Sequence, residues 1–342
     1  TDSGGDADVS VAAKLCADCP FDKQPTADHP AAKGSCSLLE PLEISYGSGF
    51  GSGYKDIRVF RPLCPGPHPV LFFVHGKSLY ESGSFFNKTL GGPYTKLLKH
   101  VASRGYVAAF VRVEQNLLDS DHERMAKDLL EATKVVFKQV STANPAQVVF
   151  AGHSMGAKVV LMATAITLGE DDSDSYVNPR AVQAISVSNE PPPVGSFVNA
   201  VKWVKKIPAD ANLSVTFVQP HDDEIAPYQD PKKPNAKALY EAMPVSHKQL
   251  VVLHGTGSGD LNAPTSPELH DDHATAMTIV GKPGGVADLA IPESYLDALD
   301  WYGVWKLLVG AMDFHFNSGS VQWAYGTMRT HGGTTAGGDV IK

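Results

Sequence analysis

Apolar runs of strand length alternate with amphipathic stretches along most of this chain. The apolar runs lie at residues 54–60, 70–74, 106–111, 147–151, 181–187, 213–218 and 247–253. The stretches with helical character lie at residues 93–104, 121–140, 157–165 and 293–309. Strands that alternate with helices predict an α/β fold built on a mostly parallel, doubly wound sheet.

Three connections in this pattern are long, at residues 169–180, 188–211 and 255–272. In open α/β sheets a ligand binds in the crevice beside the carboxyl ends of the strands. We therefore expect the three connections to be loop insertions that form the walls or lid of a site at the carboxyl ends of the strands.

The N-terminal part of the chain differs in composition from the rest. We expect residues 1–45 to be an irregular arm and residues 46–342 to be one α/β domain. All four cysteines lie in the first fifth of the chain, at Cys16, Cys19, Cys36 and Cys64. An even number of clustered cysteines predicts two disulfides that hold the arm, with three pairings open, and hence a secreted protein or another oxidising compartment. Zinc binding is disfavoured because Cys36 and Cys64 are not a closely spaced ligand pair.

Charge and hydropathy exclude two classes of partner. The chain of 342 residues has a formal net charge of -8, without a run of Lys and Arg that would track phosphates. No apolar run approaches the length that spans a bilayer. We predict a protein without a nucleic-acid surface or a transmembrane segment, with a monomer as the favoured state.

The segment Gly-His-Ser-Met-Gly at residues 152–156 carries the strongest chemical signal. It stands between a predicted strand and a predicted helix, and strand, sharp turn and helix make up a nucleophile elbow. The turn lifts Ser154 to the tip of the sheet, at a helix N-terminus that favours negative charge. We predict that Ser154 is a nucleophile.

A serine nucleophile needs two backbone N–H groups that stabilise the oxyanion. His75 and Gly76 follow the strand at 70–74, which is the position of the oxyanion loop in such a fold. The expected donors are the N–H groups of Lys77 and of Met155, the residue after the nucleophile.

The serine also needs an acid and a histidine, in the chain order serine, acid, histidine. Three acids follow the strand at 213–218, namely Asp222, Asp223 and Glu224, and the residues alone do not choose between them. Three histidines follow the last strand, namely His254, His270 and His273. We predict His273, because it stands at a loop-to-helix junction far enough from the strand to fold back. His270 and His273 with their two Asp neighbours lack a frame for a metal, so we predict neither a metal nor a cofactor.

These motifs resemble the α/β-hydrolase superfamily, and within it cutinase-like polyester hydrolases and plant-type chlorophyllases. The segment 152–156 matches the polyester hydrolases residue for residue, and residues 223–227 resemble their Asp-x-Ile-Ala-Pro. The first residue of that motif is the triad acid, so the resemblance implies Asp223. Residues 74–76 and 97–106 resemble chlorophyllase segments, and the chlorophyllase arrangement would point to Glu190 as the acid.

The sequence therefore predicts a secreted serine carboxylesterase that uses Ser154, Asp223 and His273 and forms an acyl-enzyme. The expected substrate is a small-molecule or polymeric ester that is lipid-like, polyester or chlorophyll-like. Three alternatives are a catalytically inactive binding protein with a hydrolase fold, a lipase, thioesterase or peptidase of the same fold, and a redox module on the arm.

Overall fold

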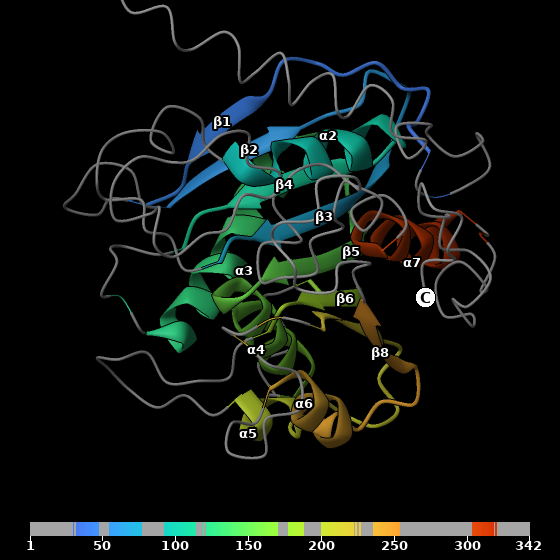
Figure 1. The fold of residues 1–342 in the computed structure, drawn as a ribbon. Helices are drawn as coiled ribbons and strands as arrows, with labels where there is room; N and C mark the ends of the chain where they lie inside the picture. The colour runs from blue at the N-terminus through green and yellow to red at the C-terminus, as the bar shows by residue number, and fades with distance from the viewer. Residues whose placement is uncertain are drawn as a thin grey trace, which may run out of the picture.

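The computed structural model describes residues 30, 32–47, 55–76, 92–113, 119, 121–169, 177–187, 200–221, 223, 226, 235–253, 303–317 and 319. Within these ranges eight strands form a single sheet, in the order β1-β2-β4-β3-β5-β6-β7-β8 (Figure 1). The strands are β1 (Leu42–Ser45), β2 (Asp56–Phe60), β3 (His68–Val74), β4 (Val107–Val111), β5 (Ala143–His153), β6 (Pro179–Ile185), β7 (Ser214–Pro220) and β8 (Lys248–Leu253).

The sheet is mostly parallel. Strands β3 to β8 pair with one another in the parallel sense, while β1 and β2 add an antiparallel edge in which β2 pairs with β4. All residues of β3 and β4 are buried, as the near-continuous apolar runs of a central parallel strand require. The predicted mostly parallel α/β fold is confirmed.

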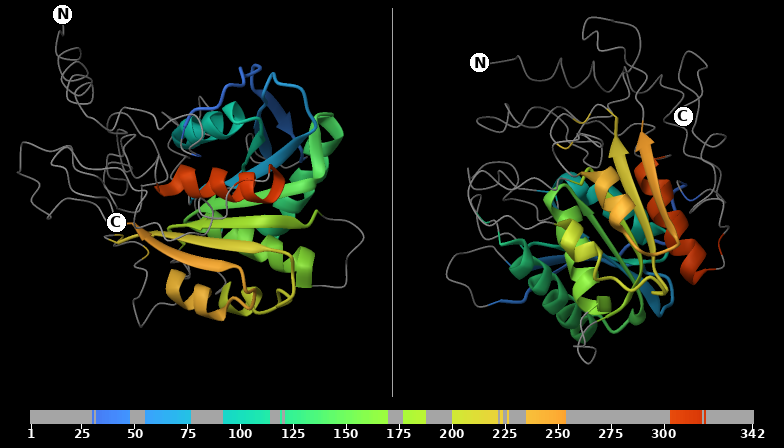
Figure 2. Two further views of the ribbon diagram at one scale, coloured as in Figure 1. Left: turned by 90° about the vertical axis from the view of Figure 1, so that its right-hand side faces the viewer. Right: turned by 90° about the horizontal axis from the view of Figure 1, so that it is seen from below.

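Helices cover both faces of the sheet (Figure 2). One face packs against α3 (His122–Gln139), α4 (Met155–Gly169), α5 (Ala200–Val204) and α6 (Ala236–Ala242). The other packs against α2 (Thr95–Ser103), which follows the 3-10 turn η4 (Gly92–Tyr94), and against α7 (Lys306–Phe316). Each face has its own hydrophobic core, so the sheet is buried between two helical layers.

Local signals fix the ends of the helices that the sequence predicted. The carboxylate of Asp121 accepts a hydrogen bond of 3.0 Å from the Arg124 N–H and caps α3. Gly105 follows α2 with a φ of 93°, a left-handed conformation that glycine adopts without strain. The predicted helices at 93–104 and 121–140 are therefore confirmed to within a few residues.

Several elements differ from the sequence expectation. Residues 42–45, assigned to an irregular arm, form β1 and pair with β2. The last described helix ends at Phe316 instead of residue 309, because Gly310 is buried within α7 and does not stop it. The connection at 188–211 contains α5.

The position of the 169–180 connection also differs from the expectation. Helix α4 starts beside Ser154 and its 15 residues extend about 22 Å away from it. Strand β6 starts opposite Val148, near the beginning of the parallel strand β5. Both ends of this connection therefore lie near the N-terminal ends of the parallel strands. Ser154 lies at their C-terminal ends, so the two ends of the connection do not border the predicted site.

A disulfide joins Cys36 to Cys64, which are 28 residues apart. The arm is held further by the Gly34 N–H, which donates to the hydroxyl of Ser103 over 2.9 Å. Cys16 and Cys19 lie outside the described residues, so the predicted second disulfide stays a prediction. No helix in the described ranges is both long enough and apolar enough to cross a bilayer.

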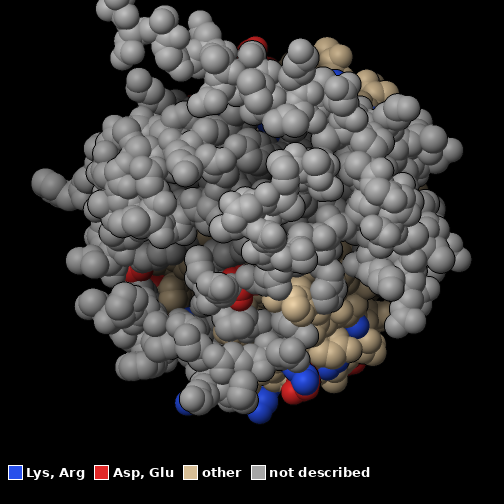
Figure 3. Space-filling view, viewed as in Figure 1, with Lys and Arg blue, Asp and Glu red and all other residues tan. Residues whose placement is uncertain are grey.

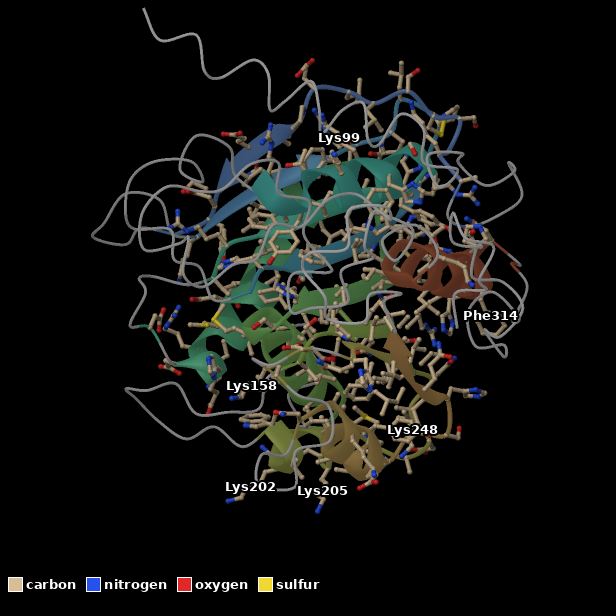
Figure 4. All side chains as sticks on the ribbon, viewed as in Figure 1. Lys99, Lys158, Lys202, Lys205, Lys248 and Phe314 are labelled. Atoms are coloured by element: carbon tan, nitrogen blue, oxygen red, sulfur yellow. A yellow bond between two sulfur atoms is a disulfide. The ribbon has the colours of Figure 1, made fainter. Side chains whose placement is uncertain are left out.

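On the face shown in Figure 3, Lys and Arg atoms lie in the region of α5, α6 and β8, with Asp and Glu atoms among them. Lys202 and Lys205 on α5 and Lys248 at the start of β8 are labelled in Figure 4. The ammonium group of Lys248 already donates to the carbonyl oxygens of Tyr240 and Met243. This part of the surface is therefore mixed in charge.

Candidate active site

The turn between β5 and α4 places Ser154 in an unusual conformation. Its φ is 53°, in the left-handed region that a residue with a side chain rarely adopts. The flanking glycines make this turn fit: a Cβ on Gly152 would overlap the carbonyl of Gly156, and a Cβ on Gly156 would overlap the carbonyl oxygen of Val74. A sharp, strained strand-to-helix turn with a serine at its tip is the geometry of a nucleophile elbow.

Hydrogen bonds anchor the elbow to the centre of the sheet. The Ser154 N–H donates to the carbonyl oxygen of Ile185 on β6 over 2.8 Å. The first bond of the α4 ladder runs from the Lys158 N–H to the Ser154 carbonyl oxygen over 3.4 Å. The N–H of Met155 lies before it, among the helix N–H groups that have no intrahelical acceptor. This group is therefore available in the position that the sequence predicted for an oxyanion donor.

The loop after β3 lies directly against the elbow. A Cβ on Gly76 would lie 2.8 Å from Nδ1 of His153 and 3.2 Å from the Cβ of Ser154. Glycine at position 76 is thus required for the close approach of the two segments. Lys77, the predicted second oxyanion donor, lies outside the described residues.

Tyr94 joins these two segments through its hydroxyl group. The Gly76 N–H donates to the Tyr94 hydroxyl over 3.1 Å, and the same hydroxyl lies 2.9 Å from Nδ1 of His153. Since its own N–H is engaged in this way, Gly76 cannot itself donate to an oxyanion. The next N–H along the loop, that of Lys77, stays the candidate.

Aromatic packing holds the Tyr94 ring in place. Only 2% of Tyr94 is exposed, and its ring centroid lies 4.8 Å from that of Phe73 and 6.0 Å from that of Phe110. The sequence carries no local signal for this contact, since Tyr94 stands 59 positions away from His153.

Asp223 follows the end of β7 in the sequence and is buried, with 2% of its surface exposed. One carboxylate oxygen accepts from the Ala226 N–H over 2.7 Å, and the other accepts from Nε2 of Gln219 over 2.8 Å. Strand β7 lies two positions from β5 in the sheet, so the two strand ends are about 10 Å apart. Asp222 and Glu224 lie outside the described residues.

The predicted base is not among the described residues. His254, His270 and His273 all lie beyond the described end of β8, and the alternative acid Glu190 also lies outside the described ranges. The described residues therefore bring together Ser154, Met155 and the loop at 75–76, with Asp223 two strands away.

One basic side chain is buried close to the elbow. Lys158 lies on the first turn of α4 and is 1% exposed, and burial lowers its pKa to about 8 (Figure 4). Within the described ranges, no group of three or more His, Cys, Asp and Glu side chains is arranged to hold a metal ion.

Comparison with known families adds to this geometry. Residues 39–186 match the family model described as chlorophyllase, a family of the α/β-hydrolase superfamily. The matched part runs from just before β1 to the end of β6, so it contains the 75–76 loop, Tyr94 and the elbow but not Asp223. The match supports an ester hydrolase of the α/β-hydrolase type, and the resemblance to cutinase-like enzymes stays a prediction. A search of curated proteins finds no match to the chain.

Proposed function

We propose that this chain is a serine carboxylic-ester hydrolase of the α/β-hydrolase superfamily that works through an acyl-enzyme, since residues 39–186 match the chlorophyllase family model. One observation carries the proposal: Ser154 has a φ of 53° at the end of a central parallel strand, and Gly76 in the loop after β3 lies close to its Cβ. Such strain persists only where the surrounding structure imposes it, and it is concentrated at functional sites.

In the proposed reaction, the Ser154 hydroxyl attacks the ester carbonyl carbon and a base takes its proton. The carbonyl oxygen becomes an oxyanion, which the N–H groups of Met155 and Lys77 stabilise. The base then gives its proton to the leaving alcohol, and water hydrolyses the acyl-enzyme by the same steps.

We propose Asp223 as the acid that orients the base. Its burial and its two hydrogen bonds fix the carboxylate, and a carboxylate has further lone pairs that can accept from an imidazole N–H. His273 is the proposed base, with His270 and His254 as the alternatives. Loss of the base should mimic loss of Ser154, so His273→Ala, His270→Ala and His254→Ala would identify it by their kcat values.

The chlorophyllase match favours a chlorophyll-like ester as the first substrate to test. The link to polyesters rests on the five residues of the elbow and on the segment at 223–227, so a polyester film is the second. Rates on chlorophyll, a polyester, a triglyceride and a series of p-nitrophenyl esters would rank the acyl and alcohol groups. A lipase would prefer the triglyceride.

Covalent labelling with a fluorophosphonate probe tests the proposal directly. The probe should label the protein but not Ser154→Ala, and ester hydrolysis by that variant should fall by about a millionfold. Ser186→Ala is a matched control, because Ser186 is also buried with a positive φ of 49°, at the end of the neighbouring strand. Its hydroxyl has no hydrogen-bond partner among the described residues, so its removal should leave labelling intact.

Two results would contradict the proposal. Turnover by a folded Ser154→Ala protein would assign the reaction to another group. A folded protein that neither reacts with the probe nor hydrolyses any ester would be a binding protein with a hydrolase fold.

A further inference from the structure

A pocket lies at the N-terminal ends of β5, β6 and β7. Ser154 lies at the opposite, C-terminal ends of the strands. Its volume is about 440 Å³, within the usual range for sites that bind small molecules. It is lined by Asn144, Ala146, Gln147, Arg180, Asn212, His315 and Phe316. The last two residues end α7, next to Phe314, which is labelled in Figure 4.

Among the described residues, the lining of this pocket includes the basic residues Arg180 and His315 and no acidic residue. Arg180 follows the first residue of β6 and is half-buried. In the part of the chain that the structure describes, no carboxylate forms an ion pair with the Arg180 guanidinium. A half-buried guanidinium has five N–H donors, and these need acceptors.

His315 lies close enough to Arg180 for their charges to interact. Its pKa is lowered, first by burial and then by the positive charges of Arg180 and of His247, which precedes β8. Nε2 of His315 lies 3.0 Å from the hydroxyl of Ser214 at the start of β7. Basic groups from β6, the β8 edge and α7 thus converge here, on a chain whose net charge is -8.

We infer that this pocket binds a small oxyanion, either a phosphate or a carboxylate group. The planar guanidinium of Arg180 matches both groups, because it can donate two parallel hydrogen bonds to their oxygens. The amide side chains of Gln147 and Asn212 supply further donors in the lining. The pocket lies at the N-terminal ends of the strands and Ser154 lies at their C-terminal ends. Anion binding in the pocket is therefore independent of the proposed ester hydrolysis.

Calorimetric titration with inorganic phosphate, and separately with citrate, tests this inference. The titrations should be run at constant ionic strength, so that general screening does not change between them. We expect saturable binding with one site per chain, and binding to only one of the two anions would identify the preferred group. The same titration on Ser154→Ala should give an unchanged affinity, even if the protein proves to be catalytically inactive.

Arg180→Gln should weaken binding at least about tenfold, because it removes a charge-assisted pair of hydrogen bonds. Lys99→Gln is the matched control, since Lys99 is exposed on α2 and its loss changes the net charge equally (Figure 4). Arg180→Gln should also keep its melting temperature and its rate of ester hydrolysis, if the protein hydrolyses esters.

Three outcomes would overturn the inference. They are no saturable binding by the unaltered protein, equal affinity in Arg180→Gln, and binding that appears only after the carboxylates of residues 170–174 are neutralised. The last result would mean that this acidic segment, which precedes β6 in the sequence, is the internal occupant of the pocket.

Discussion

The hydroxyl of Tyr94 lies 2.9 Å from Nδ1 of His153, the residue that immediately precedes the proposed nucleophile. The same hydroxyl accepts a hydrogen bond from the Gly76 N–H in the loop after β3. The relative position of the elbow and this loop therefore depends on one buried hydroxyl group. In a serine hydrolase these two segments carry the nucleophile and an oxyanion donor, and small displacements between them cost rate.

Replacement of Tyr94 by Phe should lower kcat by about 10- to 100-fold with little change in KM, because the oxyanion donors matter most in the transition state. Tyr46→Phe is a suitable control, since the Tyr46 hydroxyl donates to the Arg112 carbonyl oxygen over 3.0 Å. Tyr94→Phe loses the two hydrogen bonds of its hydroxyl and Tyr46→Phe loses one, so both should be less stable, and only Tyr94→Phe should lower kcat. Steady-state kinetics and thermal melts of the pair would separate the two effects. An unchanged kcat in Tyr94→Phe would mean that the ring packing alone holds the loop.

Asp223→Asn should lower kcat by about 10⁴, because an amide would favour the wrong tautomer of the base. It should also lower stability by about 1–3 kcal/mol. An Asn side chain has one acceptor oxygen, whereas the Gln219 amide and the Ala226 N–H both donate to Asp223. Assays well below the melting temperature would separate the loss of rate from unfolding.

Asp222→Asn and Glu224→Gln are the controls for this prediction, and both should lose far less activity. If Glu190→Gln were the damaging substitution, the acid would follow β6 as in the chlorophyllase arrangement, and the assignment of Asp223 would be wrong.

Loss of the bond between Cys36 and Cys64 should lower the free energy of unfolding by about 3–4 kcal/mol in the chain-entropy model, given a closed loop of 28 residues. Urea unfolding of the Cys36→Ala/Cys64→Ala protein would measure the difference. Ester hydrolysis at 25 °C should persist, since the bond lies outside the elbow and its neighbours.

Mass spectrometry after alkylation without reductant would count the free cysteines. Protection of all four would support two disulfides and an oxidising compartment. Alkylation of Cys36 or Cys64 in the folded protein would contradict the bond.

His100 should make the protein sensitive to acid. Burial is the main cause that lowers its pKa to about 4, and Nε2 lies 3.1 Å from the carbonyl oxygen of Pro30. The folded pKa lies below the unfolded value of 6.5, so the folded state binds fewer protons than the unfolded state between these values. The contribution of His100 to stability is therefore complete above pH 6.5 and is lost as the pH falls to about 4, by about 3 kcal/mol in total.

His100→Gln cannot gain this proton, and its amide can still donate to the Pro30 carbonyl oxygen. It should be less stable at pH 7.5, because the imidazole ring packs against Trp305 at 4.9 Å, but its stability should depend less on pH. Equal slopes of unfolding free energy against pH in the two proteins would contradict a role for His100.

The parts of the fold that local pattern controls could be predicted from the sequence. Strand β3 is a run of seven buried residues, and Asp121 and Gly105 are local signals for helix ends. The elbow was predictable for the same reason, because two glycines and a serine within five residues follow a strand.

Features that depend on distant residues could not be predicted. Tyr94 and His153 are 59 positions apart, and nothing near Tyr94 in the sequence indicates the contact. Strand β1 is four residues long and becomes a strand only through its pairing with β2. The predicted helix ended at residue 309, whereas α7 continues to Phe316, with Gly310, Ala311 and Met312 buried in it.

The position of α7 on the sheet has a consequence for the nascent chain on the ribosome. This helix packs against β5 and β6 on the face of the sheet that includes Val149 and Ala181. Its Asp313 bonds to Tyr106 and Arg104, which lie 207 and 209 positions earlier in the sequence. The eight described strands are synthesised by Leu253, but α7 is complete only at Phe316. At ordinary translation rates, synthesis of the residues between Leu253 and Phe316 takes about 3–13 seconds. During that interval the nascent sheet exposes an apolar surface, so a chaperone that shields it should raise the yield of folded protein.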